Sequence, residues 1–398
     1  MIENYTLKLL CILLGCMVCL RTEECLQRVY IDKSYNQSCI VVPKTTNDWH
    51  CASLDNAFRD LKSINRTCIY LNSNTNIENT RTLEYVYSLS ISSISNNSSL
   101  SSITCKENTA LRFKHCSNIQ LSLLTFHGCG DIFEIEWNDE FYEINKKKSL
   151  NVSVAITFER CTIVNISDVE LKSSNGYALL FKDTNYAKVN RASIVDSRYA
   201  YVKYENETFE IGGGIFVYYH DSDAGNNNHF DVCDSDITTT RSVSKLVVVS
   251  PSPDHLPYGK GGGIHLSVSQ KLTGNSIRIE RTKIMNNSAN NGAGVFVRLQ
   301  KHSRYNHVTL DGCILINNTA KQIGGGFYAR VYAETNNSVI MSRSRIIGNQ
   351  ANVGGGISLI SMQFNSVGNN RTYQLHELTL SNNKAQLGTA MHLSLIHI

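Results

Sequence analysis

Short alternations of apolar and polar residues recur along the C-terminal half of the chain about every 31 residues. Each interval carries apolar residues at positions i, i+2 and i+7, then asparagine, alanine and a cluster of glycines. Because the side chains of a strand alternate between its two faces, each i, i+2 pair directs one face of a short strand inward. The apolar slots hold Ile277/Val308/Val339/Tyr373, Ile279/Leu310/Met341/Leu375 and Ile284/Leu315/Ile346/Leu380.

The spacing of these slots predicts a solenoid of stacked coils. A unit of about 31 residues cannot bury its apolar face alone, whereas stacking the units in register buries it. We expect the recurrent asparagines to form a column of stacked amides at a tight turn, the alternative being a turn that faces solvent. The glycines supply positive φ or close backbone approach. The asparagines are Asn287, Asn318, Asn349 and Asn383, the alanines Ala289, Ala320, Ala351 and Ala385, and the glycine clusters lie at 212–214, 261–263, 292–294, 324–326, 354–356 and 388.

The same spacing extends toward the N-terminus with inserts of variable length. We therefore predict an all-β solenoid over residues 85–392, preceded by a small cap over residues 22–84. Residues 48–63 have helical spacing and belong to this cap, while residues 244–258, which hold three of the four prolines, predict an inserted loop. The additional slots are Ile119/Leu121/Phe126, Val164/Ile166/Leu171, Ala187/Val189/Ile194 and Phe230/Val232/Ile237.

Both ends of the sequence carry segments that we place outside the fold. Residues 9–20 are an unbroken apolar run, too short for a membrane span of about 20 residues, so residues 1–21 predict a signal peptide; a retained signal anchor is the alternative. Residues 393–398 resemble a translated library adapter and predict a non-native tail. The natural chain would then continue, and we expect membrane contact only through that missing C-terminal region.

Composition narrows the class of protein further. Net charge is +4, with 18% charged and 42% hydrophobic residues, which excludes a disordered chain and gives no reason to expect a nucleic-acid partner. Cleavage near Arg21 leaves ten of the 13 cysteines, an even number that is compatible with disulfides. The sequence has no paired C-x-x-C motifs, so we do not predict a structural zinc site. Sequons support the secretory interpretation. They lie at Asn36, Asn65, Asn96, Asn97, Asn151, Asn165, Asn206, Asn286, Asn317, Asn336 and Asn370.

The motif N-x-A followed by G-G-G-I/F resembles the repeats of chlamydial polymorphic outer-membrane proteins and of secreted animal β-helix proteins. Residues 110–130 and 155–181 are similar to the early coils of the animal proteins. The resemblance covers most of residues 85–392 and implies a right-handed parallel β-helix of the pectin-lyase-like class. That hand also follows the general rule for parallel crossovers. The fold hosts lyases, hydrolases and adhesins, so it does not by itself assign an activity.

Two cysteines occupy the same slot of neighbouring coils, since Cys116 and Cys161 each follow Phe113 or Phe158 by three residues. If those coils are adjacent, the strand spacing of about 4.8 Å fits the Cα separation of a disulfide. A pair of buried free thiols is the alternative.

Outward positions of the strands that follow the glycines predict two columns of ligand-binding side chains. Aromatic rings flanked by arginines can hold sugar rings or acidic glycans on a flat sheet. The alternatives are packing between strands and cover by the loop at 244–258. The predicted binding residues are Phe216, Tyr218, His265, Phe296, Arg298, Tyr328 and Arg330.

Glu280 and Asp311 are the weak candidates for catalysis, because they share a slot one coil apart. Two stacked carboxylates would lie roughly 5 Å apart, near the separation that retaining glycosidases use. Alternatively, they are solvated surface acids that Arg281 and Lys283 neutralise. Of the motifs of pectin hydrolases, N-x-D and D-D are missing from the sequence, and H-G occurs only as an isolated His127–Gly128.

Residues 220–236 concentrate aspartate, asparagine and histidine. An EF-hand starting at Asp221 fails, because Asn226 and Val232 stand where glycine and glutamate are required. An irregular calcium site and a polar loop stay open, and we assign no metal and no cofactor. The sequence thus predicts a secreted or cell-surface β-helix protein with a non-catalytic adhesion or glycan-binding role, whose partner is an extracellular glycan or protein. The alternative is a carbohydrate-active enzyme, a polysaccharide lyase or a glycoside hydrolase.

Overall fold

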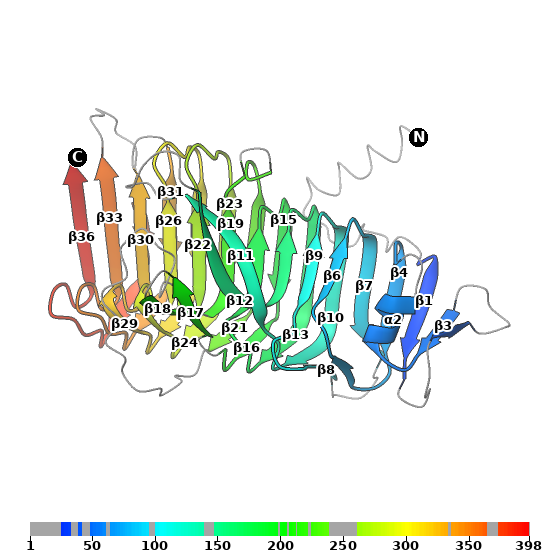
Figure 1. The fold of residues 1–398 in the computed structure, drawn as a ribbon. Coiled ribbons are helices and arrows are strands. Elements are labelled where there is room, and N and C mark those ends of the chain that lie inside the picture. The colour runs from blue at the N-terminus through cyan, green and yellow to red at the C-terminus, as the bar shows by residue number, and fades with distance from the viewer. Residues whose placement is uncertain are drawn as a thin grey trace.

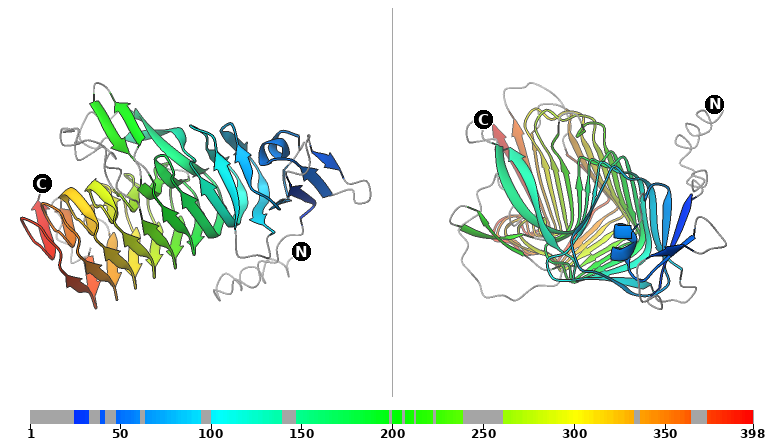
Figure 2. Two further views of the ribbon diagram at one scale, coloured as in Figure 1. Left: turned by 90° about the horizontal axis from the view of Figure 1, so that it is seen from below. Right: turned by 45° about the vertical axis from the view of Figure 1, so that its right-hand side comes forward.

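The structure, a computed structural model, describes residues 25–32, 39–41, 48–60, 64–94, 100–138, 147–197, 200–204, 207–211, 213–221, 224–238, 261–332, 336–363 and 373–397. These residues form a long stack of coils, with the first strands at one end and the last strands at the other (Figure 1). The turned views show the coils surrounding a shared interior (Figure 2). Successive coils pair through parallel strands, so the predicted right-handed parallel β-helix with a small N-terminal cap is confirmed.

One side of the stack, sheet B, receives one strand from each coil. Neighbouring strands come from successive coils and run parallel in register, as where Val295 faces Phe327 and Leu299 faces Val331. In order along the axis they are β6 (Arg81–Glu84), β9 (Leu111–Lys114), β12 (Lys147–Glu159), β14 (Tyr177–Lys182), β19 (Gly213–Tyr219), β22 (Ile264–Val268), β26 (Val295–Leu299), β30 (Phe327–Tyr332), β33 (Ile357–Gln363) and β36 (Met391–His397).

The remaining two sides belong to sheet A, in which each coil turns once between two rows of strands. The first row is β1 (Gln27–Ile31), β4 (Thr67–Leu71), β7 (Tyr87–Ser93), β10 (Ser117–His127), β13 (Ile163–Lys172), β15 (Tyr186–Asn190), β20 (His229–Cys233), β23 (Ser276–Glu280), β27 (His307–Asp311), β31 (Ser338–Ser342) and β34 (Tyr373–His376). The second row is β5 (Thr75–Ile77), β8 (Ser101–Cys105), the second halves of β10 and β13, then β16 (Ser193–Val195), β21 (Asp236–Thr238), β24 (Lys283–Met285), β28 (Ile314–Ile316), β32 (Arg345–Ile347) and β35 (Thr379–Ser381).

The interior is filled by the apolar slots that the sequence pattern predicts. The i, i+2 and i+7 residues from Ile119 to Ile346 are buried in one continuous core, whereas Tyr373, Leu375 and Leu380 of the last described coil are only partly buried. Aromatic rings stack from coil to coil: the centroids of Phe113 and Phe158 lie 5.1 Å apart and those of Phe158 and Phe181 lie 5.2 Å apart. Stacked coils therefore bury an apolar face that no single coil could bury.

The predicted asparagine column forms at one corner of the coils and is buried. Nδ2 of Asn318 donates to Oδ1 of Asn349 at 2.9 Å and to the carbonyl oxygen of Ile284 at 2.9 Å. Oδ1 of Asn318 accepts from both the backbone N–H and Nδ2 of Asn287, at 3.0 and 2.8 Å. Asn349 makes the same contacts with Asn383. Each amide thus satisfies backbone groups at a buried turn, as such groups require.

A second asparagine column, which the sequence analysis did not find, runs along another corner. Nδ2 of Asn275 donates to Oδ1 of Asn306 at 2.9 Å, and Nδ2 of Asn306 donates to Oδ1 of Asn337 at 3.0 Å. The backbone N–H of Asn228 donates to Oδ1 of Asn275. In both columns the residue immediately before each column asparagine has positive φ. The sequence signal for such a column is therefore a repeated pair, a residue that adopts positive φ followed by asparagine. The preceding residues are Asn227, Gly274, Tyr305 and Asn336 in this column and Asn286, Asn317, Gly348 and Asn382 in the first.

Glycine is required at the corner before sheet B for the two expected reasons. Gly261 has φ of +64°, which L side chains rarely adopt. A Cβ atom on Gly263 would lie 2.6 Å from the carbonyl oxygen of Gly294 in the next coil and 2.6 Å from Cγ2 of Ile284. The coils therefore approach too closely at this corner for any other residue.

The N-terminal end is closed by α2 (Leu54–Asp60), which begins where Ser53 Oγ accepts a hydrogen bond from the N–H of Asn56. Leu54 and Ala57 are fully buried against the first coil. The helix is shorter than the predicted range of 48–63, because residues 48–51 form β3 (Asp48–Cys51), which pairs with β1. Parallel pairing also starts earlier than residue 85, since β1 is in register with β4 and β4 with β7.

Several further elements flank the coils. β2 (Ile40–Val41) pairs with β3, β11 (Asp131–Asn138) forms an antiparallel hairpin with β12, β17 (Ala200–Tyr204) pairs with β18 (Glu207–Ile211), and β25 (Ser288–Asn291) pairs with β29 (Thr319–Ile323).

The predicted tail enters the fold as far as His397, because β36 is in register with β33 throughout; its non-native origin stays a prediction. The predicted signal peptide (1–21) and inserted loop (244–258) lie outside the described residues. No helix in the described part is long and apolar enough to span a bilayer.

Replacing a central amide of the first column tests its contribution to stability. We expect Asn318→Ala to lower the free energy of unfolding by about 3 kcal/mol, because it leaves buried backbone and amide groups unsatisfied on both sides. Asn317→Gly is the matched control, since Gly348 occupies that slot in the next coil and the side chain of Asn317 is exposed. Thermal unfolding followed by circular dichroism measures both variants, and equal losses would contradict the ladder as a stabilising element.

Candidate functional site

The residues predicted to bind a ligand lie on successive strands of sheet B, from β19 to β30. Their registers place them in two columns, two residues apart along each strand, as the sequence predicts. The first column is Phe216, His265, Phe296 and Tyr328, and the second contains Tyr218, Arg298 and Arg330.

These seven side chains are buried, none being more than 9% exposed. The rings pack on one another: Phe216 stacks on His265 with centroids 4.4 Å apart, and Phe296 meets the edge of the His265 ring at 5.0 Å. Tyr177 Oη lies 3.4 Å from Nδ1 of His265. The expectation of a solvent-exposed face is therefore wrong here. The ring contacts fit the alternative of packing between strands, whereas cover by the loop at 244–258 falls outside the described residues. Ligand binding by these side chains stays a prediction that requires their packing to open.

The two catalytic candidates face each other across β23 and β27, as their shared slot predicts. Glu280 is flanked by two arginines, since Arg278 forms an ion pair with it and Nη1 of Arg281 lies 3.4 Å from Oε2. The predicted neutralisation by Arg281 is thus present, whereas Lys283 instead lies 3.8 Å from Asp236.

Asp311 is held in its charged form by the following coil. Nε of Arg343 lies 2.9 Å from Oδ1 of Asp311, and Ser342 Oγ donates to the same oxygen at 2.8 Å. The hydrogen bond from Arg343 lowers the pKa of Asp311 below its usual range. An acid with a lowered pKa is a poor proton donor, and the charge of Glu280 is also matched by arginine. The geometry therefore favours structural ion pairs at these two residues over a catalytic carboxylate pair.

The same arrangement recurs along the corner between the two rows of sheet A. Nε and Nη2 of Arg191 both lie 2.6 Å from the carboxylate oxygens of Asp168, and Arg281 contacts Asp234 at 2.6 and 2.9 Å. Exposed pairs of this kind contribute little to stability, but they join each coil to a neighbour. The corner residues, all with positive φ, are Leu123, Asp168, Arg191, Asp234, Arg281, Gly312, Arg343 and Glu377.

The polar run at 220–236, of which residues 222 and 223 lie outside the described part, is held by protein contacts. Oδ1 of the buried Asp183 accepts hydrogen bonds from the N–H groups of His220 at 2.6 Å and of Asp221 at 3.0 Å, and Asp221 forms an ion pair with Arg160. Burial raises the pKa of Asp183 because the charged carboxylate is desolvated. Within the described residues, no group of three or more His, Cys, Asp or Glu side chains could hold a metal ion.

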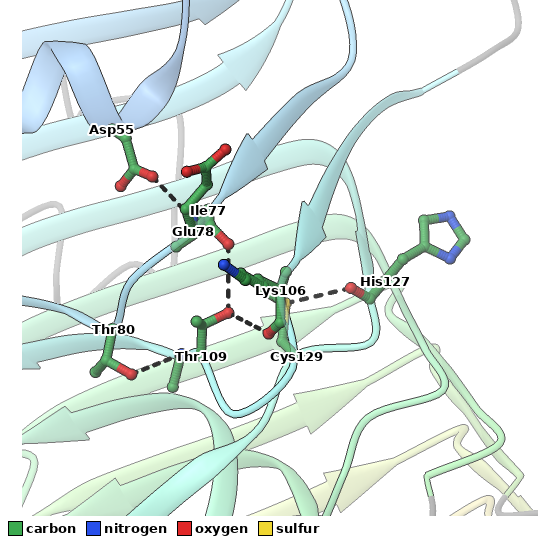
Figure 3. The surroundings of a disulfide bond; sticks show 10 residues. Asp55, Ile77, Glu78, Thr80, Lys106, Thr109, His127 and Cys129 are labelled. Carbon is green, nitrogen blue, oxygen red and sulfur yellow. Dashed lines mark hydrogen bonds between the residues drawn. A yellow bond between two sulfur atoms is a disulfide. The ribbon is translucent and has the colours of Figure 1, made fainter.

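Three disulfides fasten the N-terminal coils and cap. Near one of them, Oδ2 of Asp55 in α2 accepts from the N–H of Glu78, and Thr109 Oγ1 donates to the carbonyl oxygen of Lys106 at 2.6 Å (Figure 3). Two of the disulfides lie within residues 22–84, and the third joins two successive coils. The disulfides are Cys25–Cys68, Cys39–Cys51 and Cys105–Cys129.

The proposed Cys116–Cys161 bridge is absent, and both residues are buried free thiols. Each points to a backbone oxygen of the preceding coil: Sγ of Cys116 donates to the oxygen of Leu83 at 3.2 Å, and Sγ of Cys161 donates to that of Phe113 at 3.5 Å. The hydrogen bond with Cys116 and burial raise the pKa of Cys161, which keeps this thiol protonated. The alternative of stacked thiols therefore describes the structure.

Three sequons are by-products of the asparagine columns. Asn286, Asn317 and Asn336 are exposed corner residues with positive φ, each followed by a buried column asparagine and then by the Ser or Thr that starts a strand. Their glycosylation stays a prediction, as does that of the exposed Asn65 and the half-buried Asn165. Asn151 lies in β12, where its side chain is not described. The sequons outside the described residues are Asn36, Asn96, Asn97, Asn206 and Asn370.

The outer face of sheet A carries a pocket of about 460 Å³ near the N-terminal end, across β1, β4, β7 and β10. Serines at alternate outward positions leave this hollow, since Ser88, Ser90 and Ser92 alternate with the buried Leu89 and Ile91. The lining residues are Cys25, Arg28, Thr67, Cys68, Tyr70, Ser88, Leu89, Ser90, Ser92, Asn118 and Gln120.

Neighbouring contacts fix the walls of this pocket. Nδ2 of Asn118 donates to Ser88 Oγ at 3.1 Å. The Tyr70 ring stacks on Tyr30, and Tyr30 on His50, with centroids 5.5 and 5.1 Å apart. The sequence analysis missed this site; the available signal is the row of small hydroxyl residues beside a column of aromatic ones.

The free thiols can be counted directly. A chain lacking residues 1–21 should titrate four thiols with Ellman's reagent once unfolded and almost none while folded, because Cys116, Cys161, Cys233 and Cys313 are free and buried. A count of two in the unfolded, unreduced protein would instead indicate a bridge between two of them.

Asp183 makes stability depend on pH. Its pKa is raised in the folded state, so it adds no cost below its unfolded pKa of about 4 and a growing cost as pH rises through its folded pKa. We expect Asp183→Asn, which preserves the acceptor Oδ1, to gain stability relative to the wild type as pH rises from acidic to neutral, by about 1 kcal/mol. Urea unfolding at several pH values measures the difference, and a relative loss on raising the pH would contradict it.

Comparison with known proteins gives likeness in architecture only. No family model and no curated protein matches this sequence. Among solved structures, a pectate lyase from Paenibacillus sp. 0602 is 11% identical, with a TM-score of 0.36 over 70% of this chain and 72% of that one. A GH136 lacto-N-biosidase from Eubacterium ramulus is 11% identical, with a TM-score of 0.34 over 94% and 68%. The Streptococcus pneumoniae surface protein and adhesin PfbA is 11% identical, with a TM-score of 0.26 over 86% and 94%.

These neighbours differ in activity, and their low identity carries nothing about the chemistry of this chain. The topology rests on the chain's own parallel registers, which run from β1 to β36. The chain therefore has a parallel β-helix fold.

Proposed function

We propose that this chain is an extracellular, non-catalytic β-helix protein that binds a glycan in the pocket between β1 and β10. The observation that carries the proposal is the composition of the pocket: hydroxyls, side-chain amides, an arginine and a tyrosine line a volume of about 460 Å³. A site that presents convergent polar groups beside an aromatic ring suits a sugar, whose hydroxyls need hydrogen-bond partners and whose C–H face packs on a ring.

The pocket is pre-formed, which favours binding. Strand pairing fixes the spacing of its four strands. The Cys25–Cys68 disulfide joins β4 to the residues just before β1. Asn118 is already oriented by its bond to Ser88. Groups held in place before binding lose little conformational entropy when the ligand arrives.

The disulfides support an extracellular location. Three of them among the described residues indicate folding in an oxidising compartment, as in secreted and cell-surface proteins. An extracellular protein is the alternative partner, for which a pocket of this size would take one protruding side chain.

Glycan-array screening of the secreted full-length chain, followed by calorimetric titration of the hits, tests the proposal. We expect Tyr70→Ala and Gln120→Ala each to weaken binding about tenfold or more, because they remove the stacking ring or a polar partner. Gln374→Ala is the matched control, since Gln374 is an outward glutamine on the last described strand of the same row. No array signal, or equal affinity for all variants, would remove the pocket from consideration.

A carbohydrate-active enzyme is the second candidate, favoured by the register of Glu280 with Asp311. Assays for reducing sugars and unsaturated uronates on the same preparation test it. We expect no turnover; release of products that is lost in Glu280→Gln but retained in Thr309→Ala would establish the enzyme instead.

A further inference from the structure

One charged residue, Arg28, lines the pocket, and it forms no ion pair with the residues that the structure describes. Of the eleven lining residues only Arg28 carries a charge at neutral pH, and none is a carboxylate. The Arg28 side chain is exposed, and within the described residues its guanidinium makes no hydrogen bond or ion pair. Asp48, its neighbour in register on β3, does not line the pocket.

Several arginines of later coils, in contrast, are paired with carboxylates. Arg191, Arg281 and Arg343 each contact a carboxylate of another coil with at least two nitrogen atoms. A guanidinium presents five donors in a planar fork that matches a carboxylate, sulfate or phosphate. The pocket therefore offers a positive fork beside hydroxyl and amide groups.

We infer that the ligand of this pocket is an anionic saccharide, whose carboxylate or sulfate ester pairs with Arg28 while its hydroxyls bond to Ser90, Asn118 and Gln120. The inference rests on the proposed function and adds the charge of the ligand. Each part of such a ligand meets its complement: the anion meets the arginine, the hydroxyls meet side chains that both donate and accept, and the sugar face meets the Tyr70 ring.

Matched neutral and anionic probes test the charge. Calorimetric titrations would compare a neutral oligosaccharide with its uronic-acid and its sulfated counterparts, at low and high salt, on the full-length chain. We expect the anionic probes to bind more tightly and to lose affinity in high salt. Which of the two binds more tightly identifies the group as carboxylate or sulfate.

Variants of Arg28 separate this inference from the proposed function. Arg28→Gln should weaken binding of the anionic probe about tenfold or more and leave the affinity for the neutral probe unchanged. Arg28→Lys should lose less of the affinity for the anionic probe. Arg345→Gln is the charge-matched control, because Arg345 is exposed on β32, far along the stack. Unaltered thermal unfolding of each variant confirms that the fold is intact.

Two results would count against the proposals in different ways. If Gln120→Ala abolishes binding while Arg28→Gln does not change the affinity for anionic probes, the anionic ligand is wrong and the glycan-binding function stands. If no probe binds, or if none of the pocket variants affects binding, the proposed function itself is wrong.

Discussion

Every feature of this molecule depends on the backbone hydrogen bonds that join each coil to the next in parallel register. These hydrogen bonds fix the register between successive coils, so a residue at a given slot lies directly above its counterpart in the preceding coil. Apolar slots then merge into one core, and polar slots become columns whose members can bond only to one another or to nearby backbone. Buried asparagines such as Asn318 meet that requirement because an amide both donates and accepts along the axis.

The same register explains why chemical signals in this sequence mislead. Stacking places Glu280 beside Asp311, which imitates a catalytic pair, but arginines on the same and following coils match both charges. Stacking also repeats a corner residue with positive φ before each buried column asparagine, and where that residue is asparagine and Ser or Thr follows the pair, as at Asn317, the fold itself creates a sequon. In a solenoid, therefore, a polar residue that recurs at one slot is explained first by its structural position in the coil. A residue that departs from the repeat is better evidence for a functional site.

The pocket on the outer face of sheet A is such a departure. The first coils carry serines beside stacked aromatic rings, next to a disulfide that joins Cys25, just before β1, to Cys68 in β4. Among the described side chains, no carboxylate forms an ion pair with Arg28. At this end of the solenoid the exposed arginine lines a hollow together with hydroxyl and amide side chains.

The sequence by itself determined the repeating architecture. Period-2 alternation and the i+7 slot placed Ile277, Ile279 and Ile284 in the core, and the recurrent asparagine predicted a buried ladder, because these patterns follow from local strand geometry. Only the tertiary structure decided which outward residues meet solvent. Phe216 and Arg298 lie on the outer side of sheet B and are nevertheless buried. Likewise, only the tertiary structure pairs Cys105 with Cys129 and directs the thiols of Cys116 and Cys161 to backbone oxygens. The hollow at Ser90 depends on four strands that are separated in sequence.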